Sequence, residues 1–207
     1  MKNIIMLLLG GMIFSTIPNL TIAQQKGYQV GDSAADFKLE SVDGAWVSMS
    51  DIRGAKGAIV IFSCNTCPYV VAYEDRMINL HNKYAAKGYP VIAINSNDDK
   101  VSPGDSIDKM KERSKEKNFP FHYVYDKTQE TIKAYGASRT PHVYILEKEG
   151  EEYIVKYIGT IDNNYQNATA VTEKYVEDAM DAILSGEKIA VETTKAIGCT
   201  IKWTKAD

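Results

Sequence analysis

The order of patterns along this chain of 207 residues predicts an α/β fold with a central mixed sheet flanked by helices. Three apolar runs that are typical of buried strands alternate with helical patterns, which indicates parallel strands covered on both faces. Two pairs of alternating segments around glycine-containing turns predict hairpins, one of them an N-terminal β-hairpin extension. No linker interrupts residues 24–207, so this part of the chain is predicted to form one domain.

The spacing of apolar residues places each element. The N-terminal hairpin is predicted at 36–39 and 46–49, around Asp43-Gly44. Buried strands are predicted at 58–62, 90–95 and 121–125. Helices are predicted at 69–87, 105–117, 128–135 and 171–184. The second hairpin is predicted at 143–146 and 153–157, and the residues after Gly186 form a tail.

Residues 1–23 have the layout of a secretory signal peptide. Lys2 precedes an apolar stretch over 4–17, and the small-residue end Thr21-Ile22-Ala23 follows Pro18. The alternative is a membrane anchor, but the stretch is shorter than the roughly 20 residues that a spanning helix needs. We therefore expect cleavage near Ala23, a periplasmic or otherwise exported protein, and no stable membrane insertion after cleavage.

Charge and cysteine content narrow the function further. The net charge is −3, which argues against nucleic acid or an anionic membrane as a partner. The chain has three cysteines, an odd number, so at least one lacks an intramolecular partner at any moment. In an oxidising compartment such a chain is expected to use its cysteines chemically.

Two of the cysteines, Cys64 and Cys67, lie between a predicted buried strand and a predicted helix. The N-terminus of a helix favours a thiolate, and Pro68 is well tolerated at a helix start. This position predicts a catalytic pair for thiol–disulfide exchange. The alternative is a metal site, for which His142 is the candidate third ligand, but the remaining Cys and His residues are not closely spaced.

A second motif, Arg139-Thr140-Pro141-His142, precedes the second hairpin. We expect a cis bond before Pro141 and expect the turn to lie beside the cysteines, where residues 139–141 bind a partner. Arg139 could lower the pKa of a thiolate or be a solvated surface residue. His142 is interpreted as an ordinary strand residue, with an acid or metal ligand as the alternative.

Two further residues have open roles. Glu74, two turns beyond Cys67, is interpreted as part of an ion pair, with a proton carrier for the thiol as the alternative. Cys199 lies in an apolar tail that is expected to pack. If the tail reaches the active-site end, Cys199 could resolve a disulfide; otherwise it is a buried structural thiol.

Several blocks resemble the alkyl hydroperoxide reductase/thiol-specific antioxidant (redoxin) superfamily, in particular its CxxC-containing peroxiredoxin-like branch. The opening from Gly31-Asp32 to Asp43-Gly44 is similar to the start of redoxin domains. Further similar blocks are 64–70, 73–76, 93–98, 110–113, 119–121 and 196–203. The resemblance implies a thioredoxin-like fold. It also implies two orders of attack: Cys64 first, as in thioredoxins, or Cys67 as the peroxidatic cysteine, as in peroxiredoxins.

The leading hypothesis is an exported thiol–disulfide oxidoreductase in which Cys64 attacks and Cys67 resolves. Its expected partners are protein thiols or disulfides and an upstream electron donor or acceptor, and no cofactor is expected. The alternatives are a thiol peroxidase that uses Cys67 and a metal-binding or metallochaperone module that uses Cys64, Cys67 and His142.

Overall fold

The structure is a computed structural model that describes residues 27–205. The predicted signal peptide lies outside these residues. The strands of the main sheet are β1 (Ser33–Ala34), β2 (Leu39–Ser41), β3 (Trp46–Val47), β4 (Gly57–Ser63), β5 (Val91–Asn95), β6 (His122–Tyr125), β8 (His142–Glu149) and β9 (Glu152–Gly159). The helices are α1 (Pro68–Tyr84), α2 (Ile107–Lys117), α3 (Glu130–Tyr135) and α4 (Tyr175–Ser185). Two short strands, β7 (Arg139–Thr140) and β10 (Cys199–Thr200), form a separate pair.

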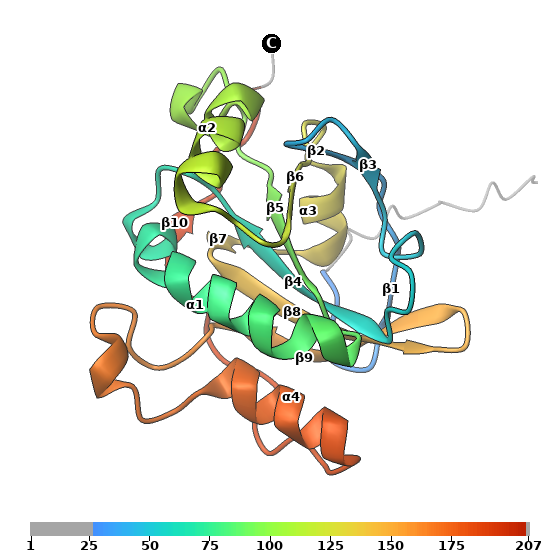
Figure 1. The fold of residues 1–207 in the computed structure, drawn as a ribbon. Coiled ribbons are helices and arrows are strands. Elements are labelled where there is room, and N and C mark those ends of the chain that lie inside the picture. The colour runs from blue at the N-terminus through green and yellow to red at the C-terminus, as the bar shows by residue number, and fades with distance from the viewer. Residues whose placement is uncertain (1–26, 206–207) are drawn as a thin grey trace, which may run out of the picture.

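The central sheet is mixed, as the sequence predicts. Its strand order is β1-β9-β8-β4-β5-β6-β2-β3. Strand β5 runs parallel to β4 and β6, whereas β8 is antiparallel to both β4 and β9. Helices α1 and α4 cover one face and α3 covers the other (Figure 1). The N-terminal hairpin is confirmed, and β2 attaches it to β6 at one end of the sheet.

Burial on both faces explains the continuous apolar sequence of β4. Ile59 and Ile61 pack into the core under α1, α2 and α4. Val60 and Phe62 point to the opposite side and pack into the core that contains Ile132 of α3. All seven residues of β4 are buried, so neither face of this strand tolerates polar alternation.

Some boundaries differ from the predicted ones. The predicted helix 105–117 begins only at Ile107. Residues 103–105 form a separate 3₁₀ turn, and the side chain of its last residue, Asp105, is fully buried. The last helix begins at Tyr175 rather than at residue 171. Gly88 follows α1 and a 3₁₀ turn with a positive φ of 97°, which confirms that it ends this helical segment.

The short strands β1, β7 and β10 were not predicted. Strand β1 pairs with β9, and β10 pairs with β7. Across residues 27–205, no helix has both the length and the apolar character needed to cross a membrane.

Candidate active site

The strand-to-helix turn after β4 holds the two cysteines of the CxxC motif. Cys67 is the N-cap residue of α1, and Pro68 takes the first helical position, where no backbone N–H is needed. Both side chains are buried: Cys64 is 3% exposed and Cys67 is 2% exposed. They pack with Val70, and Tyr69 lies at the edge of the cluster. All three cysteines of the chain are free thiols in this structure.

Thr140 contacts both thiols of the pair. The bond between Thr140 and Pro141 is cis, as predicted. The Cys67 thiol donates a hydrogen bond to the Thr140 carbonyl oxygen at 3.2 Å. The Cys64 Sγ and the Thr140 hydroxyl are 3.3 Å apart and share a hydrogen bond. The structure therefore brings the two predicted motifs together in one site.

The C-terminal tail completes the site. Strand β10 lies beside β7 (Figure 1) and is antiparallel to it. In this register Cys199 is directly opposite Thr140. Cys199 packs against the cluster of Cys64, Cys67 and Val70. The guanidinium of Arg139 donates to the Gly198 carbonyl oxygen at 3.2 Å, so it contacts the tail. Arg139 is exposed to solvent, which was one of the two expected alternatives, but its contact with the tail was not anticipated from the sequence.

Electrostatics distinguish the two central sulfurs. The hydrogen bond from Cys64 lowers the pKa of Cys67 to about 4 against the opposing effect of burial, and further contacts to Cys199 and to the Val70 backbone lower it too. The Cys67 side chain forms no cap hydrogen bond with the first turn of α1, so the effect of the Val70 backbone is that of a longer contact. The same hydrogen bond, with burial and the nearby Asp105 carboxylate, raises the pKa of Cys64 well above its usual range. Cys67 is therefore the thiol of the pair that loses its proton first, and it then gives up the hydrogen bond that it donates to the Thr140 carbonyl oxygen.

Asp105 holds the CxxC turn in place, a role that the sequence analysis missed. Its side chain is fully buried. One oxygen accepts from the backbone N–H groups of Asn65 at 2.7 Å and Thr66 at 3.2 Å. The other accepts from the side chains of Thr66 at 3.0 Å, Asn97 at 2.8 Å and Ser102 at 2.7 Å. The one available signal was the acid in Pro103-Gly104-Asp105, a turn that interrupts the predicted helix start.

Glu74 forms the expected ion pair, but with residues of another helix. Both of its oxygens accept from the Arg113 guanidinium, at 2.7 and 2.8 Å, and Lys117 lies 3.4 Å away. The Glu74 carboxylate is 2% exposed. It therefore joins α1 to α2.

His142 does not join the cysteines. Its imidazole packs at 5.0 Å from the ring of Tyr144, and its Nδ1 has no hydrogen-bond partner. Burial lowers the pKa of His142 to about 4. Among residues 27–205, no group of three or more His, Cys, Asp or Glu side chains is arranged to hold a metal ion.

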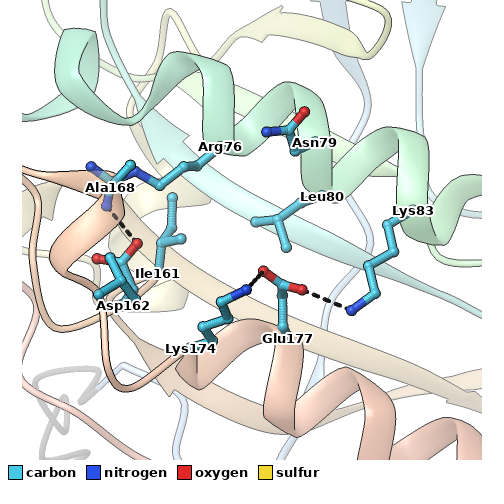
Figure 2. Close-up of a pocket in the computed structure, with 10 residues that line it drawn as sticks. Arg76, Asn79, Leu80, Lys83, Ile161, Asp162, Ala168, Lys174 and Glu177 are labelled. Atoms are coloured by element: carbon cyan, nitrogen blue, oxygen red, sulfur yellow. Dashed lines mark hydrogen bonds and ion pairs between the residues drawn. The ribbon is translucent and has the colours of Figure 1, made fainter.

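A cavity between α1 and α4 is separate from this site. Figure 2 shows that its charged walls are paired with one another: Arg76 with Asp162, and Glu177 with both Lys83 and Lys174. None of the three cysteines lines it. The three basic and two acidic residues that line the cavity are therefore all engaged in ion pairs with one another.

A CxxC pair at a strand-to-helix turn, packed against a cis-proline turn, defines the thioredoxin-like class of thiol redox proteins. The chain belongs to the AhpC/TSA family, whose family model matches residues 30–158. The family and the fold that the sequence resemblance implies are thus confirmed.

Curated and solved relatives agree with this assignment. The thiol-disulfide oxidoreductase ResA of Oceanobacillus iheyensis is 29% identical over 166 residues, which cover 78% of this chain and 82% of that protein. An uncharacterized conserved protein from Geobacillus kaustophilus is 36% identical, with a TM-score of 0.79 over 86% of this chain and 94% of that chain. A putative thiol:disulfide interchange protein DsbE from Chlorobium tepidum shares the fold, with a TM-score of 0.57 at 23% identity over 75% of this chain and 98% of that chain. The curated relatives are named thiol-disulfide oxidoreductases, which is the enzyme class that the sequence predicts.

Proposed function

We propose that this protein is an exported thiol–disulfide oxidoreductase that uses Cys64 and Cys67 as its redox pair. The observation that carries the proposal is the pair of buried thiols at the start of α1, both hydrogen-bonded to Thr140 of the cis-proline turn. The names of the curated relatives support the reaction class. The pattern of residues 1–23 supports export.

In the proposed reaction, the Cys67 thiolate attacks one sulfur of a partner's disulfide. The partner's S–S bond breaks, its second sulfur leaves as a thiolate, and a mixed disulfide to Cys67 forms. Cys64 then loses its proton and attacks the Cys67 sulfur, which releases the partner's first sulfur and leaves a Cys64–Cys67 disulfide. The partner gains two electrons, and an upstream dithiol restores the enzyme. The same steps in reverse oxidise a partner dithiol.

This order reverses the leading hypothesis from the sequence, in which Cys64 attacks first. The reason is the environment of the two sulfurs. Cys67 has the lower pKa, whereas the buried Asp105 carboxylate opposes a charge on Cys64. A thiolate that is present at neutral pH is the better starting nucleophile.

Reduction of insulin disulfides by dithiothreitol, with and without the protein, tests the reaction. Wild type should accelerate it, and the Cys64→Ser/Cys67→Ser double variant should not. Equal rates for these two proteins would refute the proposal.

Mixed-disulfide trapping tests the order of attack. Both single variants should be made in a Cys199→Ser background and mixed with a peptide that contains one disulfide. Cys64→Ser should accumulate a peptide adduct on Cys67, because its resolving thiol is missing, and Cys67→Ser should not. Accumulation only in Cys67→Ser would restore the order in which Cys64 attacks.

The lowered pKa of Cys67 also favours a second function, reduction of peroxides, since the resemblance places the peroxidatic cysteine at this position. Stopped-flow reaction of the reduced protein with hydrogen peroxide tests it. A peroxidase would form a sulfenate at Cys67 much faster than a free thiol does. A rate equal to that of glutathione would leave disulfide exchange as the function.

A further inference from the structure

The C-terminal tail occupies the edge of the active site that a partner polypeptide would need. An extended peptide binds an exposed strand edge through main-chain hydrogen bonds. The edge of β7 lies beside both cysteines through Thr140, and in this structure β10 pairs with it. The residue of β10 that lies opposite Thr140 is a cysteine, Cys199. The tail thus places a sulfur where an incoming partner would place its own.

Contacts on both sides of Cys199 hold the tail in this position. Before it, the Thr194 N–H donates to the Ile158 carbonyl, and the Thr194 hydroxyl shares a 2.7 Å hydrogen bond with the Tyr157 hydroxyl. After it, Ile201 is buried in the core, and the Lys202 N–H donates to the Asn97 side chain at 2.9 Å. The position of Cys199 is therefore built into the fold.

Gly198 allows the tail to approach the site closely. A Cβ atom at this position would lie 2.0 Å from the Thr140 carbonyl oxygen, which is a backbone atom that cannot move aside. Only glycine lets β10 lie this near to the turn before Pro141. As a result, Cys199 packs against the cluster that contains Cys67, and the two thiols shift each other's pKa.

The three thiols differ in access. Cys64 and Cys67 are almost fully buried, whereas Cys199 is only partly buried. Burial and the adjacent Cys67 raise the pKa of Cys199 to about 11 in the reduced protein. The part that comes from Cys67 disappears once Cys67 is in a disulfide, because a disulfide sulfur carries no charge.

We propose that Cys199 is a third redox cysteine and that residues 197–200 act as an internal substrate, with Cys199 in the place of the partner's cysteine. The proposal rests on the proposed function of the Cys64–Cys67 pair. In the oxidised enzyme, the Cys199 thiol loses its proton to solvent and attacks the Cys67 sulfur. The Cys64–Cys67 bond breaks, a Cys67–Cys199 bond forms, and Cys64 leaves as a thiolate that takes up a proton. No external oxidant is needed, since one disulfide is exchanged for another.

This exchange gives the enzyme a closed form. With Cys67 and Cys199 linked, β10 is covalently held on the edge of β7, and a partner must displace the tail before it can pair there. Reduction of the Cys67–Cys199 bond frees both sulfurs and leaves β10 held on the edge of β7 by non-covalent contacts alone, as in this structure, so that a partner can displace it. The tail is thus a redox-dependent competitor of the partner.

A matched pair of variants tests the link by mass. Cys64→Ser keeps Cys67 and Cys199, which are in contact, whereas Cys67→Ser keeps Cys64 and Cys199, and the hydrogen-bond partners of Cys64 are Cys67 and Thr140. Each reduced variant should be incubated with oxidised glutathione and then digested without reduction. Cys64→Ser should yield a peptide linked through Cys67 and Cys199, and two molecules of reduced glutathione per protein. Cys67→Ser should instead carry glutathione on its cysteines.

The expected ratio follows from effective concentration. Groups joined within one chain reach at least roughly millimolar effective concentrations. At about 0.1 mM free glutathione, the internal disulfide of Cys64→Ser should exceed glutathionylated Cys67 by about tenfold or more. Adding Gly198→Ala to Cys64→Ser should shift this ratio toward the glutathione adduct, because the new methyl group pushes β10 off β7.

The outcomes separate the two proposals. If Cys64→Ser carries glutathione on Cys67 while Cys199 stays a free thiol, the internal substrate is refuted even when wild type reduces insulin. If the linked peptide forms but wild type does not reduce insulin, the third redox cysteine stands and the oxidoreductase function fails. Equal yields of linked peptide from Cys64→Ser and Cys67→Ser would also refute the specific pairing with Cys67.

Discussion

The buried carboxylate of Asp105 should control both the stability of the protein and the reactivity of its thiols. In Asp105→Asn, one oxygen becomes an NH₂ group. The Thr66 and Ser102 hydroxyls can turn to accept from it, but the Asn97 amide cannot turn, because its own oxygen already accepts from Lys202. The variant therefore loses one buried hydrogen bond and the charge that strengthens the two backbone bonds to residues 65 and 66.

Leaving a buried partner of a charged group unsatisfied costs about 1–3 kcal/mol, and weaker backbone bonds add to this, so we expect a loss of about 2–4 kcal/mol. For a protein of this size, 1 kcal/mol shifts Tm by about 2–4 °C, so Tm should fall by about 4–16 °C. Since the Asp105 charge raises the pKa of Cys64, that pKa should also fall in the variant.

Thermal unfolding of the reduced protein and pH-dependent alkylation of its thiols measure the two effects. Asp108→Asn is the matched control, because the Asp108 side chain is 83% exposed and its one ion pair is a 3.8 Å contact with Lys111. Such surface pairs contribute at most about 1 kcal/mol to stability. If the two variants melt at the same temperature and Cys64 reacts with the wild-type pH profile, Asp105 does not hold the CxxC turn as argued.

Three further predictions concern charge. Arg113→Met should cost about 3 kcal/mol in urea unfolding because the buried Glu74 carboxylate loses both of its hydrogen bonds to Arg113 and keeps only Lys117, at 3.4 Å, as a basic partner. The Glu74→Gln/Arg113→Met double variant should recover much of the loss; additive losses would contradict this. Iodoacetamide should alkylate Cys67 at a nearly constant rate from pH 9 down to about pH 5. In Cys64→Ala, which has no side-chain donor at this position, the rate should begin to fall at a higher pH; matching profiles would contradict the lowering of the Cys67 pKa by Cys64. The lowered pKa of Cys67 stabilises the folded protein above pH 9, and this stabilisation is lost as the pH falls from 9 toward 4. The raised pKa of Cys64 acts in the opposite direction, because its contribution to folded-state stability is lost as the pH rises above 9. The stability of the reduced wild type relative to the double serine variant should thus be greatest near pH 9, and a difference independent of pH would argue against both shifts.

The sequence predicted the elements whose patterns are local. The strand at 58–62 is apolar throughout because β4 is buried on both faces, and the turn after it placed Cys64 and Cys67 correctly at the start of α1. The cis bond before Pro141 was expected from the motif context and is present.

The remaining features depend on contacts between distant segments. Strands β1 and β10 are two residues long, which is too short for an alternating pattern, and each is defined by its partner strand. Asp105 acts on a turn 40 positions earlier in the chain, and no spacing rule links the two. The lower pKa of Cys67 depends on the docked tail as well as on its helix position, so the sequence alone left the order of attack open.

The ends of the central sheet have a consequence for assembly. The outermost strands of the described sheet, β1 and β3, are each two residues long. Strands this short offer too few unpaired backbone N–H and C=O groups for a strand of a neighbouring molecule to pair stably with either end of the sheet. Within the described chain, the long strands β4, β5, β8 and β9 are all flanked on both sides. Self-association by continuous growth of this sheet is thereby disfavoured.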